Sequence, residues 1–150
     1  MYTTADFVND VFMFNDMSGQ STEVSKQDLL NQLKLCSEEL NEAVEGVETD
    51  NKEEILDGTV DLLFVAFGLM QKLHHAGYNV IGAMQTTADN NKTKFPTSGN
   101  VVEETLLSIP GSRAIYNDHY NRWVILDENN KVRKPVGYVK NNLKQYLPRN

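Results

Sequence analysis

The sequence is poor in cysteine and in basic residues, and each shortage excludes a class of protein. Cys36 is the single cysteine among 150 residues, so neither an intramolecular disulfide nor a cysteine-based zinc site can form. We expect Cys36 to be a small packing residue. Lys and Arg number 14 against 21 Asp and Glu, and a net charge of -7 opposes attraction to a phosphate backbone. We therefore predict no stable complex with nucleic acid.

Long apolar runs are also missing. The longest, from Leu62 to Met70, is far shorter than the roughly 20 residues needed to cross a bilayer. The first twelve residues carry Asp6 and Asp10 and no basic residue, unlike a secretory signal. Hydrophobic residues make up 40% of the chain, as is typical of a globular domain. The sequence thus predicts a cytoplasmic protein without membrane association.

Apolar residues recur with helical spacing over the first two thirds of the chain. We expect helices over residues 3–16, from Ser25 to about 48, over 52–75 and over 79–91, with a loop at 16–22. The third is apolar nearly all round from Leu62 to Met70, which indicates a helix buried centrally in a bundle or in an oligomer and ended by Gly77. The second helix has an apolar seam at spacings of three and four residues, namely Leu29, Leu33, Cys36, Leu40, Ala43 and Val47.

After Pro96 the pattern changes to short β-like runs over residues 101–126. We expect one strand at 122–126, a turn at 127–130 and a second strand at 131–135, with Trp123 covering this hairpin. The predicted fold is mainly α: a four-helix-bundle-type core in residues 1–96 and an irregular arm with the hairpin in 97–150, both in one domain. Three short neighbours cannot cover the third helix, so we predict a homodimer or homotetramer.

Carboxylates crowd two of the expected helices. On a helical wheel, Glu38, Glu39 and Glu42 share a face about 100° wide. Like charges one turn apart repel each other. Asp61 opens the apolar run, and a buried carboxylate is costly unless it is paired or bound to metal. If the two helices pack antiparallel, the acidic face of the second helix meets the acidic face of the third, which carries Glu54, Asp57 and Asp61.

Two interpretations of this pattern are open. The glutamates can be a solvated face, as on an acidic helical protein that mimics nucleic acid or binds a host factor. Alternatively they hold Mg²⁺, which takes oxygen ligands and retains waters for a phosphorylated substrate. A metal-bound water beside a spare carboxylate would then be a nucleophile with a general base. The position of Asp61 and the matched acidic faces favour the metal site. A di-iron bundle would need Glu-x-x-His motifs, and the sequence has none.

Several motifs also resemble a known family. They are FVNDVFMF at 7–14, EELNE at 38–42, DGTVDLLF at 57–64, AGYN at 76–79, NNKTKF at 90–95 and KVRKP at 131–135. Together they resemble the MazG-like, all-α nucleoside triphosphate pyrophosphohydrolases, in the phage-type branch that is similar to phosphoribosyl-ATP pyrophosphohydrolase.

This resemblance implies hydrolysis of an NTP or dNTP to a monophosphate and pyrophosphate with Mg²⁺ or Mn²⁺. It further implies a role in bacteriophage nucleotide-pool control, in the host cytoplasm. Matched by position, the metal-holding and water-activating residues are Glu38, Glu39, Glu42 and Asp61, with Glu39 as the general base. Asn91 and Lys94 match a phosphate-contacting pair, and Lys134 is a further substrate-binding candidate.

One position departs from the family pattern. The family usually places Glu three residues before the final Asp, and here that position is Gly58. Asp57 lies one turn before Asp61 on the same face. We therefore expect Asp57 and Asp61 to be metal ligands, with Glu54 as an accessory ligand.

Overall fold

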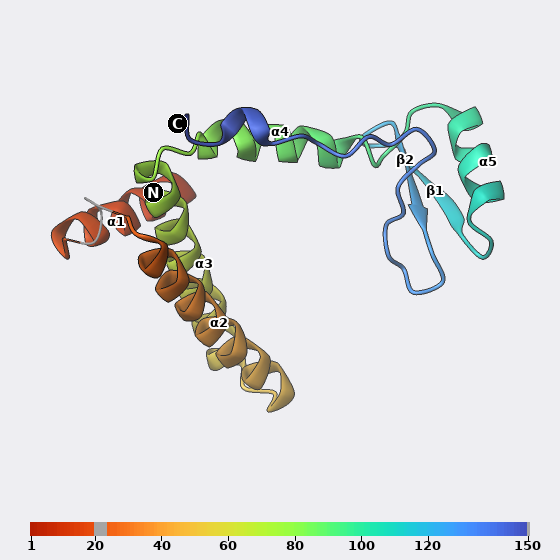
Figure 1. Cartoon of the computed structure of the whole chain (residues 1–150). Helices are drawn as coiled ribbons and strands as arrows, with labels where there is room; N and C mark the ends of the chain where they lie inside the picture. The colour runs from red at the N-terminus through yellow and green to blue at the C-terminus, as the bar shows by residue number, and fades with distance from the viewer. Residues whose placement is uncertain (20–23, 150) are drawn as a thin grey trace. The chain divides into compact units, whose positions relative to one another are not determined.

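The computed structural model describes residues 1–19 and 24–149. It is 60% helical, with five helices and one antiparallel two-stranded hairpin in the described residues, so the predicted mainly α class is confirmed. The chain forms two compact units, shown with their elements in Figure 1. Unit 1 comprises Met1–Val80 with Tyr146–Asn150, and unit 2 comprises Ile81–Gln145. The predicted division into 1–96 and 97–150 within one domain stays a prediction.

Unit 1 is built from α1 (Thr4–Met17), α2 (Lys26–Glu48) and α3 (Lys52–His75). Capping boxes of Thr3 with Asp6 and of Ser25 with Asp28 begin α1 and α2. A three-residue turn joins α2 to α3, which run antiparallel side by side (Figure 1). All three helices were predicted to within two residues. Of the predicted loop at 16–22, residues 20–22 lie outside the described part.

Small residues set the contact between α2 and α3. A Cβ added at Gly46 would lie 2.7 Å from the Ile55 nitrogen, and one added at Gly58 would lie 2.7 Å from the Ala43 nitrogen. The glycines therefore let the two backbones approach more closely than larger residues would allow.

The predicted seam of α2 is correct at Leu29, Cys36 and Ala43, which are half-buried, and wrong at Leu33, Leu40 and Val47, which are exposed. Leu33 and Leu40 are each 50% exposed, whereas Gln32 and Gly46 are buried. The seam in contact with α3 follows Gln32, Cys36, Ala43 and Gly46. The close approach at the glycines turns this edge of α2 inward and leaves the leucine stripe outside. Burial raises the pKa of the Cys36 thiol, in line with a packing role.

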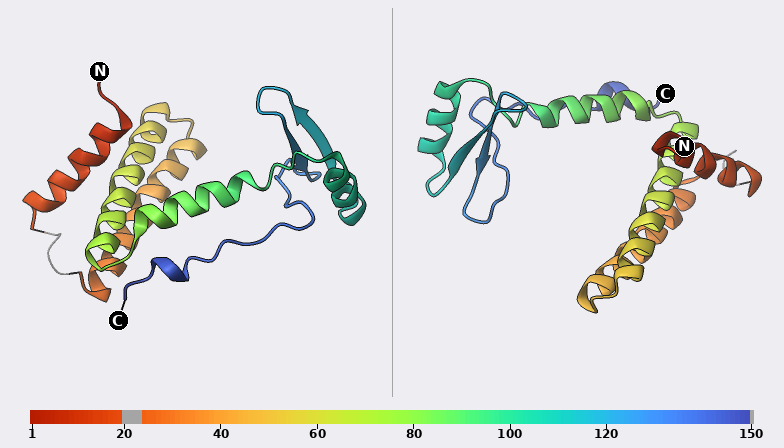
Figure 2. Two further views of the ribbon diagram at one scale, coloured as in Figure 1. Left: turned by 90° about the horizontal axis from the view of Figure 1, so that it is seen from above. Right: turned by 180° about the vertical axis from the view of Figure 1, so that it is seen from behind.

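α1 packs along α3, as the left view of Figure 2 shows. The Phe7 ring meets Phe64 and Phe67 edge to face, and Val11 is fully buried. Beside these rings, Asn15 donates to the Gln71 side chain at 2.8 Å. The α1–α3 contact is thus apolar at one end and hydrogen-bonded at the other.

The expectation that α3 is centrally buried is wrong for the single chain. Leu56 is 66% exposed and Leu63 is 49% exposed, and Asp61 is exposed as well. The reason is that α1 and α2 cover only part of the circumference of α3. No helix in the described residues is long and apolar enough to span a membrane.

Unit 2 contains α4 (Val80–Lys92, from Ile81 on), α5 (Gly99–Ser108), β1 (Arg113–Asn117) and β2 (Arg122–Leu126). A short 3-10 turn, Lys144–Tyr146, begins in unit 2 and ends at the first residue of the C-terminal part of unit 1. α4 was predicted, but α5 replaces the β-like structure expected at its position. Its β-branched residues suggested a strand, yet Val102 and Thr105 are buried one turn apart where α5 meets the hairpin.

The predicted strand at 122–126 and the turn at 127–130 are confirmed, but the predicted partner strand is wrong. β2 pairs antiparallel with β1, and Trp123 stands opposite Tyr116 with ring centroids 4.9 Å apart. Residues 131–135 contribute a single bridge, between Val132 and Leu126. The polar turn at 118–121, with Asn121 at a φ of 51°, closes the actual hairpin.

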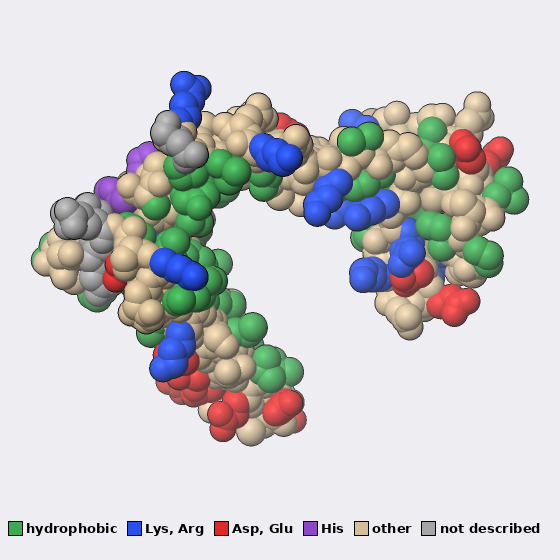
Figure 3. All heavy atoms as spheres, viewed as in Figure 1, with side chains coloured by type: hydrophobic (Ala, Val, Ile, Leu, Met, Phe, Trp, Pro, Cys, Tyr) green, Lys and Arg blue, Asp and Glu red, His purple; other side chains and the backbone are tan. Residues whose placement is uncertain are grey.

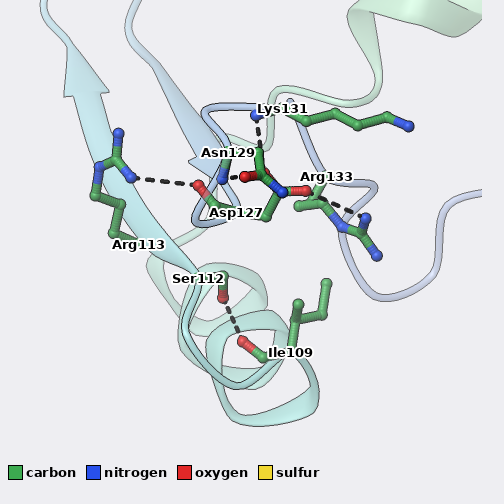
Figure 4. A network of polar contacts seen from close by, with 7 residues as sticks. All are labelled: Ile109, Ser112, Arg113, Asp127, Asn129, Lys131 and Arg133. Atoms are coloured by element: carbon green, nitrogen blue, oxygen red, sulfur yellow. Dashed lines mark hydrogen bonds and ion pairs between the residues drawn. The ribbon is translucent and has the colours of Figure 1, made fainter.

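Asp127 organises the turn after β2 (Figure 4). Its carboxylate accepts backbone N–H bonds from Lys131 at 2.9 Å and Asn129 at 3.0 Å, and the Arg133 guanidinium lies 3.4 Å away. The bond from the Lys131 N–H is the largest cause that lowers the pKa of Asp127 below its ordinary value of 3.8. The ionised carboxylate therefore holds this turn closed.

Acidification is expected to open this turn. A carboxylate whose pKa is lowered by folding stabilises the folded state above its ordinary pKa of 3.8, and this contribution is lost as pH falls through the lower, folded pKa. NMR titration of the Lys131 and Asn129 amides should show one shared midpoint below 3.8. In Asp127→Asn these amide shifts should not titrate together. A midpoint at or above 3.8 would contradict the assignment.

Candidate active site

The acidic faces of α2 and α3 meet around Glu39. Glu39 is half-buried, and its pKa is raised above the ordinary 4.5 first by burial and then by the charges of four neighbouring carboxylates. Two of these neighbours lie on α2 and two on α3, so both helices contribute to one region of negative potential. We call this group the carboxylate cluster: Glu38, Glu39, Glu42, Asp57 and Asp61.

The α2–α3 seam explains why Glu39 is the most enclosed member. Positions 32, 36, 39, 43 and 46 follow one another at spacings of four and three, so Glu39 continues the inward edge of α2. Ala43, one turn later, touches Gly58 of α3. Asp61 follows Gly58 by three residues, and because α3 runs antiparallel to α2 it lies toward the level of Glu39.

The other members of the cluster face solvent. Glu38, Glu42, Asp57 and Asp61 are all exposed, and Figure 3 shows acidic side chains gathered over the half of the α2–α3 pair nearest its connecting turn. Within the described residues, one cation forms an ion pair with the cluster: Lys34 Nζ lies 3.4 Å from Glu38. That pair is exposed and contributes little net stability. The negative charge of the cluster is thus almost unneutralised by the chain itself.

Glu54 is not brought into the cluster. It lies in the first turn of α3, where its N–H donates to the Asn51 side chain at 3.3 Å and its Cβ lies against Gly46. It is about two turns from Asp61 along α3, and it is not among the charges that raise the pKa of Glu39. Its role as an accessory ligand stays a prediction.

Gly58 explains the departure from the family pattern. It is buried at the closest approach of the helices, where any Cβ would collide with the α2 backbone at Ala43. A glutamate side chain has no space at this position. Asp57 is the adjacent residue whose side chain is exposed, and its charge acts on Glu39.

The cluster has the donor chemistry of a site for a hard divalent cation. Carboxylate oxygens are the ligands that Mg²⁺ and Mn²⁺ prefer. In the part of the chain that the structure describes, no three His, Cys, Asp or Glu side chains are gathered closely enough to hold a metal ion as they stand. Four of the five carboxylates are exposed, so their side chains have room to change rotamer. The donor set fits the metal that the resemblance implies.

The predicted phosphate-contacting residues lie in unit 2. Lys94 donates to the Asn91 side chain at 2.7 Å, so the structure brings this pair together. Lys134 Nζ lies 5.0 Å from the centre of the Tyr138 ring. Sequence reasoning did not single out Tyr138, whose hydroxyl donates to Asn90. The two residues are 48 positions apart, and no local pattern links them.

Comparison with protein families gives one result that bears on this site. Residues 13–74 match the model of the phosphoribosyl-ATP pyrophosphohydrolase family. The matched segment contains all five members of the carboxylate cluster as well as Glu54. Comparisons with curated proteins and with solved structures gave no match. The helical segment from Met13 to His74 is thus similar to the phosphoribosyl-ATP pyrophosphohydrolase family, in agreement with the resemblance found in the sequence motifs.

Proposed function

We propose that the chain is a Mg²⁺-dependent nucleoside triphosphate pyrophosphohydrolase, which converts an NTP or dNTP to its monophosphate and pyrophosphate. The family match supports the coarser assignment, a nucleotide pyrophosphohydrolase. The carboxylate cluster carries the proposal, because burial, and then the charges of four carboxylates from two helices, raise the pKa of the half-buried Glu39. A carboxyl group whose pKa is shifted by burial and by neighbouring charges is typical of catalytic sites.

The cluster divides into ligands and a base. Glu38, Glu42, Asp57 and Asp61 would hold the cation, and Mn²⁺ would substitute for Mg²⁺. A bound cation supplies charge neutralisation at the phosphates and lowers the pKa of water. Glu39 is the base: it accepts the proton of the attacking water, whose oxygen bonds to phosphorus. The bridging P–O bond between the α and β phosphates breaks, and its electron pair stays on the bridging oxygen: attack at the α phosphorus releases pyrophosphate, and attack at the β phosphorus releases the monophosphate. Partial burial makes Glu39 a better base than an exposed glutamate.

A second copy of the chain is proposed to complete the fold. The outward stripe of α2 is apolar at spacings of seven, four and three residues, and α3 adds further exposed apolar residues beside it. A stripe with this spacing suits a helix of an identical chain, so that two α2–α3 pairs make the predicted four-helix core. The α2 stripe comprises Leu33, Leu40, Val44 and Val47, and α3 adds Leu56, Val60 and Leu63.

Charge placed in the stripe is expected to dissociate the assembly. Each leucine removed from water contributes about 1.5–3 kcal/mol, so Leu33→Lys combined with Leu40→Lys should raise the dissociation constant at least a hundredfold. Sedimentation equilibrium is the measurement. Leu107→Lys is the control, because Leu107 is 85% exposed on α5 in unit 2. A wild-type chain that is monomeric at about 100 μM, well above the micromolar Kd expected of such an interface, would contradict the proposal.

A product-resolved screen tests the activity itself. Each NTP and dNTP, with modified nucleotides included, is incubated with the protein and Mg²⁺, and ³¹P NMR identifies the products. Monophosphate with pyrophosphate is the expected outcome for at least one nucleotide. Orthophosphate would indicate a diphosphatase instead. No product from any nucleotide, with folded protein, would favour the acidic binding protein. A role in bacteriophage nucleotide-pool control is proposed on the sequence resemblance.

A further inference from the structure

The charge of the chain is divided unequally between its two units. Unit 1 carries 15 Asp and Glu against 5 Lys and Arg, a net charge of -10, whereas unit 2 carries 6 against 9, a net charge of +3. Residues 129–145 contain five Lys and Arg and no acidic residue. Figure 3 shows Lys and Arg side chains on the visible face of unit 2. The chain is acidic as a whole, but unit 2 has a net positive charge and therefore attracts anions.

Unit 2 contains a hollow of about 330 Å³ between the end of α4 and the segment 135–139. Its walls are mostly apolar and include Pro96, Val101, Pro135 and Val139. The Tyr138 ring and the Asn90 side chain also line it. Small-molecule sites are typically such hollows, apolar with a few fixed polar groups. We call this hollow the unit 2 pocket.

Hydrogen bonds hold the two walls of the unit 2 pocket together. Asn90 donates to the Val139 carbonyl at 2.7 Å and accepts from the Tyr138 hydroxyl. Asn141 donates to the Thr87 hydroxyl at 3.1 Å, one turn back along α4. Asn90 thus has both ends of its amide engaged, and it fixes the Tyr138 ring at the pocket. The pocket is formed before any ligand binds.

Cations stand beside the unit 2 pocket. Lys134 Nζ lies 5.0 Å from the centre of the Tyr138 ring that lines it. Lys134 also lines a second hollow of about 270 Å³, together with Lys131 and Arg133. Lys134 thus lines the basic hollow and lies over the ring of Tyr138, which lines the apolar one, so the two kinds of surface stand beside each other at this ring. A ligand with a flat apolar part and an anionic tail matches this order of surfaces.

We propose that the unit 2 pocket binds the base and sugar of a nucleoside phosphate, with its phosphates toward Lys134 and Lys131. A base stacks on tyrosine without regard to its hydrogen-bonding edge, and the hydrogen bond from the Tyr138 hydroxyl to Asn90 holds the ring in place for it. The choice of a nucleoside phosphate rests on the proposed function. The binding itself uses residues of unit 2 alone and needs neither the carboxylate cluster nor a metal.

Binding without catalysis is the test. The full chain is titrated in EDTA with the α,β-imido analogues of dATP, dCTP, dGTP and dTTP, and separately with inorganic triphosphate as a base-free probe. Isothermal titration calorimetry measures the binding. A second readout is the fluorescence of Trp123, the single tryptophan, whose backbone N–H donates to the carbonyl of Pro96 at the pocket wall. At least one analogue should bind about tenfold or more tighter than inorganic triphosphate.

Variants locate the site. Tyr138→Leu should weaken analogue binding about tenfold, whereas Tyr138→Phe, which keeps the ring, should weaken it less. Lys134→Gln should weaken binding of the analogue and of inorganic triphosphate alike. Matched controls are Tyr120→Leu and Lys140→Gln, both exposed in unit 2 and outside the two hollows. Val139→Trp, at a side chain 75% exposed on the rim, should block the pocket without disturbing packing.

Three outcomes would overturn the proposal: no binding in EDTA, equal affinity for the analogues and inorganic triphosphate, or wild-type affinity in both Tyr138→Leu and Val139→Trp. Failure of the proposed function looks different. Analogues would then bind in the pocket while no nucleotide is hydrolysed. Conversely, if Tyr138→Leu releases pyrophosphate with an unchanged KM, the proposed function stands and the proposed nucleotide site in the unit 2 pocket is wrong.

Discussion

Replacing Asp61 by Asn is expected to reduce pyrophosphate formation by at least about a hundredfold while the chain stays folded. Groups that merely orient metal ligands contribute about 10- to 100-fold to metal affinity or activity, so loss of a direct ligand should cost at least as much. Asp61 also acts electrostatically on Glu39, the proposed base. Its side chain is exposed and has no ion-pair partner in the described residues, so asparagine fits without strain.

Asp50→Asn is the matched control for this substitution. Asp50 lies in the turn between α2 and α3 with a φ of 53°, a conformation that asparagine also tolerates. Its activity should equal that of the wild type. Circular dichroism should show the same helix content for both variants. Undiminished activity in Asp61→Asn would place the site elsewhere.

Gly58→Ala is expected to lower the stability of the fold. Alanine normally stabilises a helix by about 1 kcal/mol relative to glycine. Here its Cβ would lie 2.7 Å from the Ala43 nitrogen, and a backbone atom within a helix cannot move aside cheaply. Overpacking of this kind costs about 1–3 kcal/mol, so denaturant unfolding should show a net loss of stability.

Gly99→Ala supplies the comparison, because a Cβ there meets no atom within 4 Å. It should leave stability unchanged or raise it slightly. Gly58→Glu, which restores the residue that the family usually has at this position, should unfold the α2–α3 pair more severely than alanine does. A Gly58→Ala chain as stable as the wild type would mean that the helices are not in contact at Ala43.

Local patterns in the sequence were sufficient for the helices and for the positions of the acidic residues. Periodicity and capping residues such as Ser25 and Asn51 act within one turn, so α1 to α4 could be predicted closely. The grouping of Glu38, Glu39 and Glu42 with Asp57 and Asp61 followed from the antiparallel pairing of two consecutive helices. These features require no knowledge of distant contacts.

Features that depend on tertiary contacts were not predictable in the same way. Gly46 and Gly58 turn α2 about its axis, which leaves Leu33 and Leu40 exposed and which no single-helix pattern reveals. α5 forms despite β-branched residues because Thr105 is buried at the hairpin, and its hydroxyl accepts the N–H of Val136, 31 residues away. The exposure of Asp61 likewise depends on which helices cover α3.

The most direct test of the proposed site is the Mg²⁺ dependence of pyrophosphate formation by the wild type and by Glu39→Gln, with the nucleotide preferred in the screen. The account predicts no pyrophosphate in excess EDTA, a rate that rises and saturates as Mg²⁺ is added, and a loss of that rate in Glu39→Gln at every Mg²⁺ concentration. Pyrophosphate formed equally fast in EDTA, or at the wild-type rate by Glu39→Gln, would contradict a metal-dependent site at the carboxylate cluster.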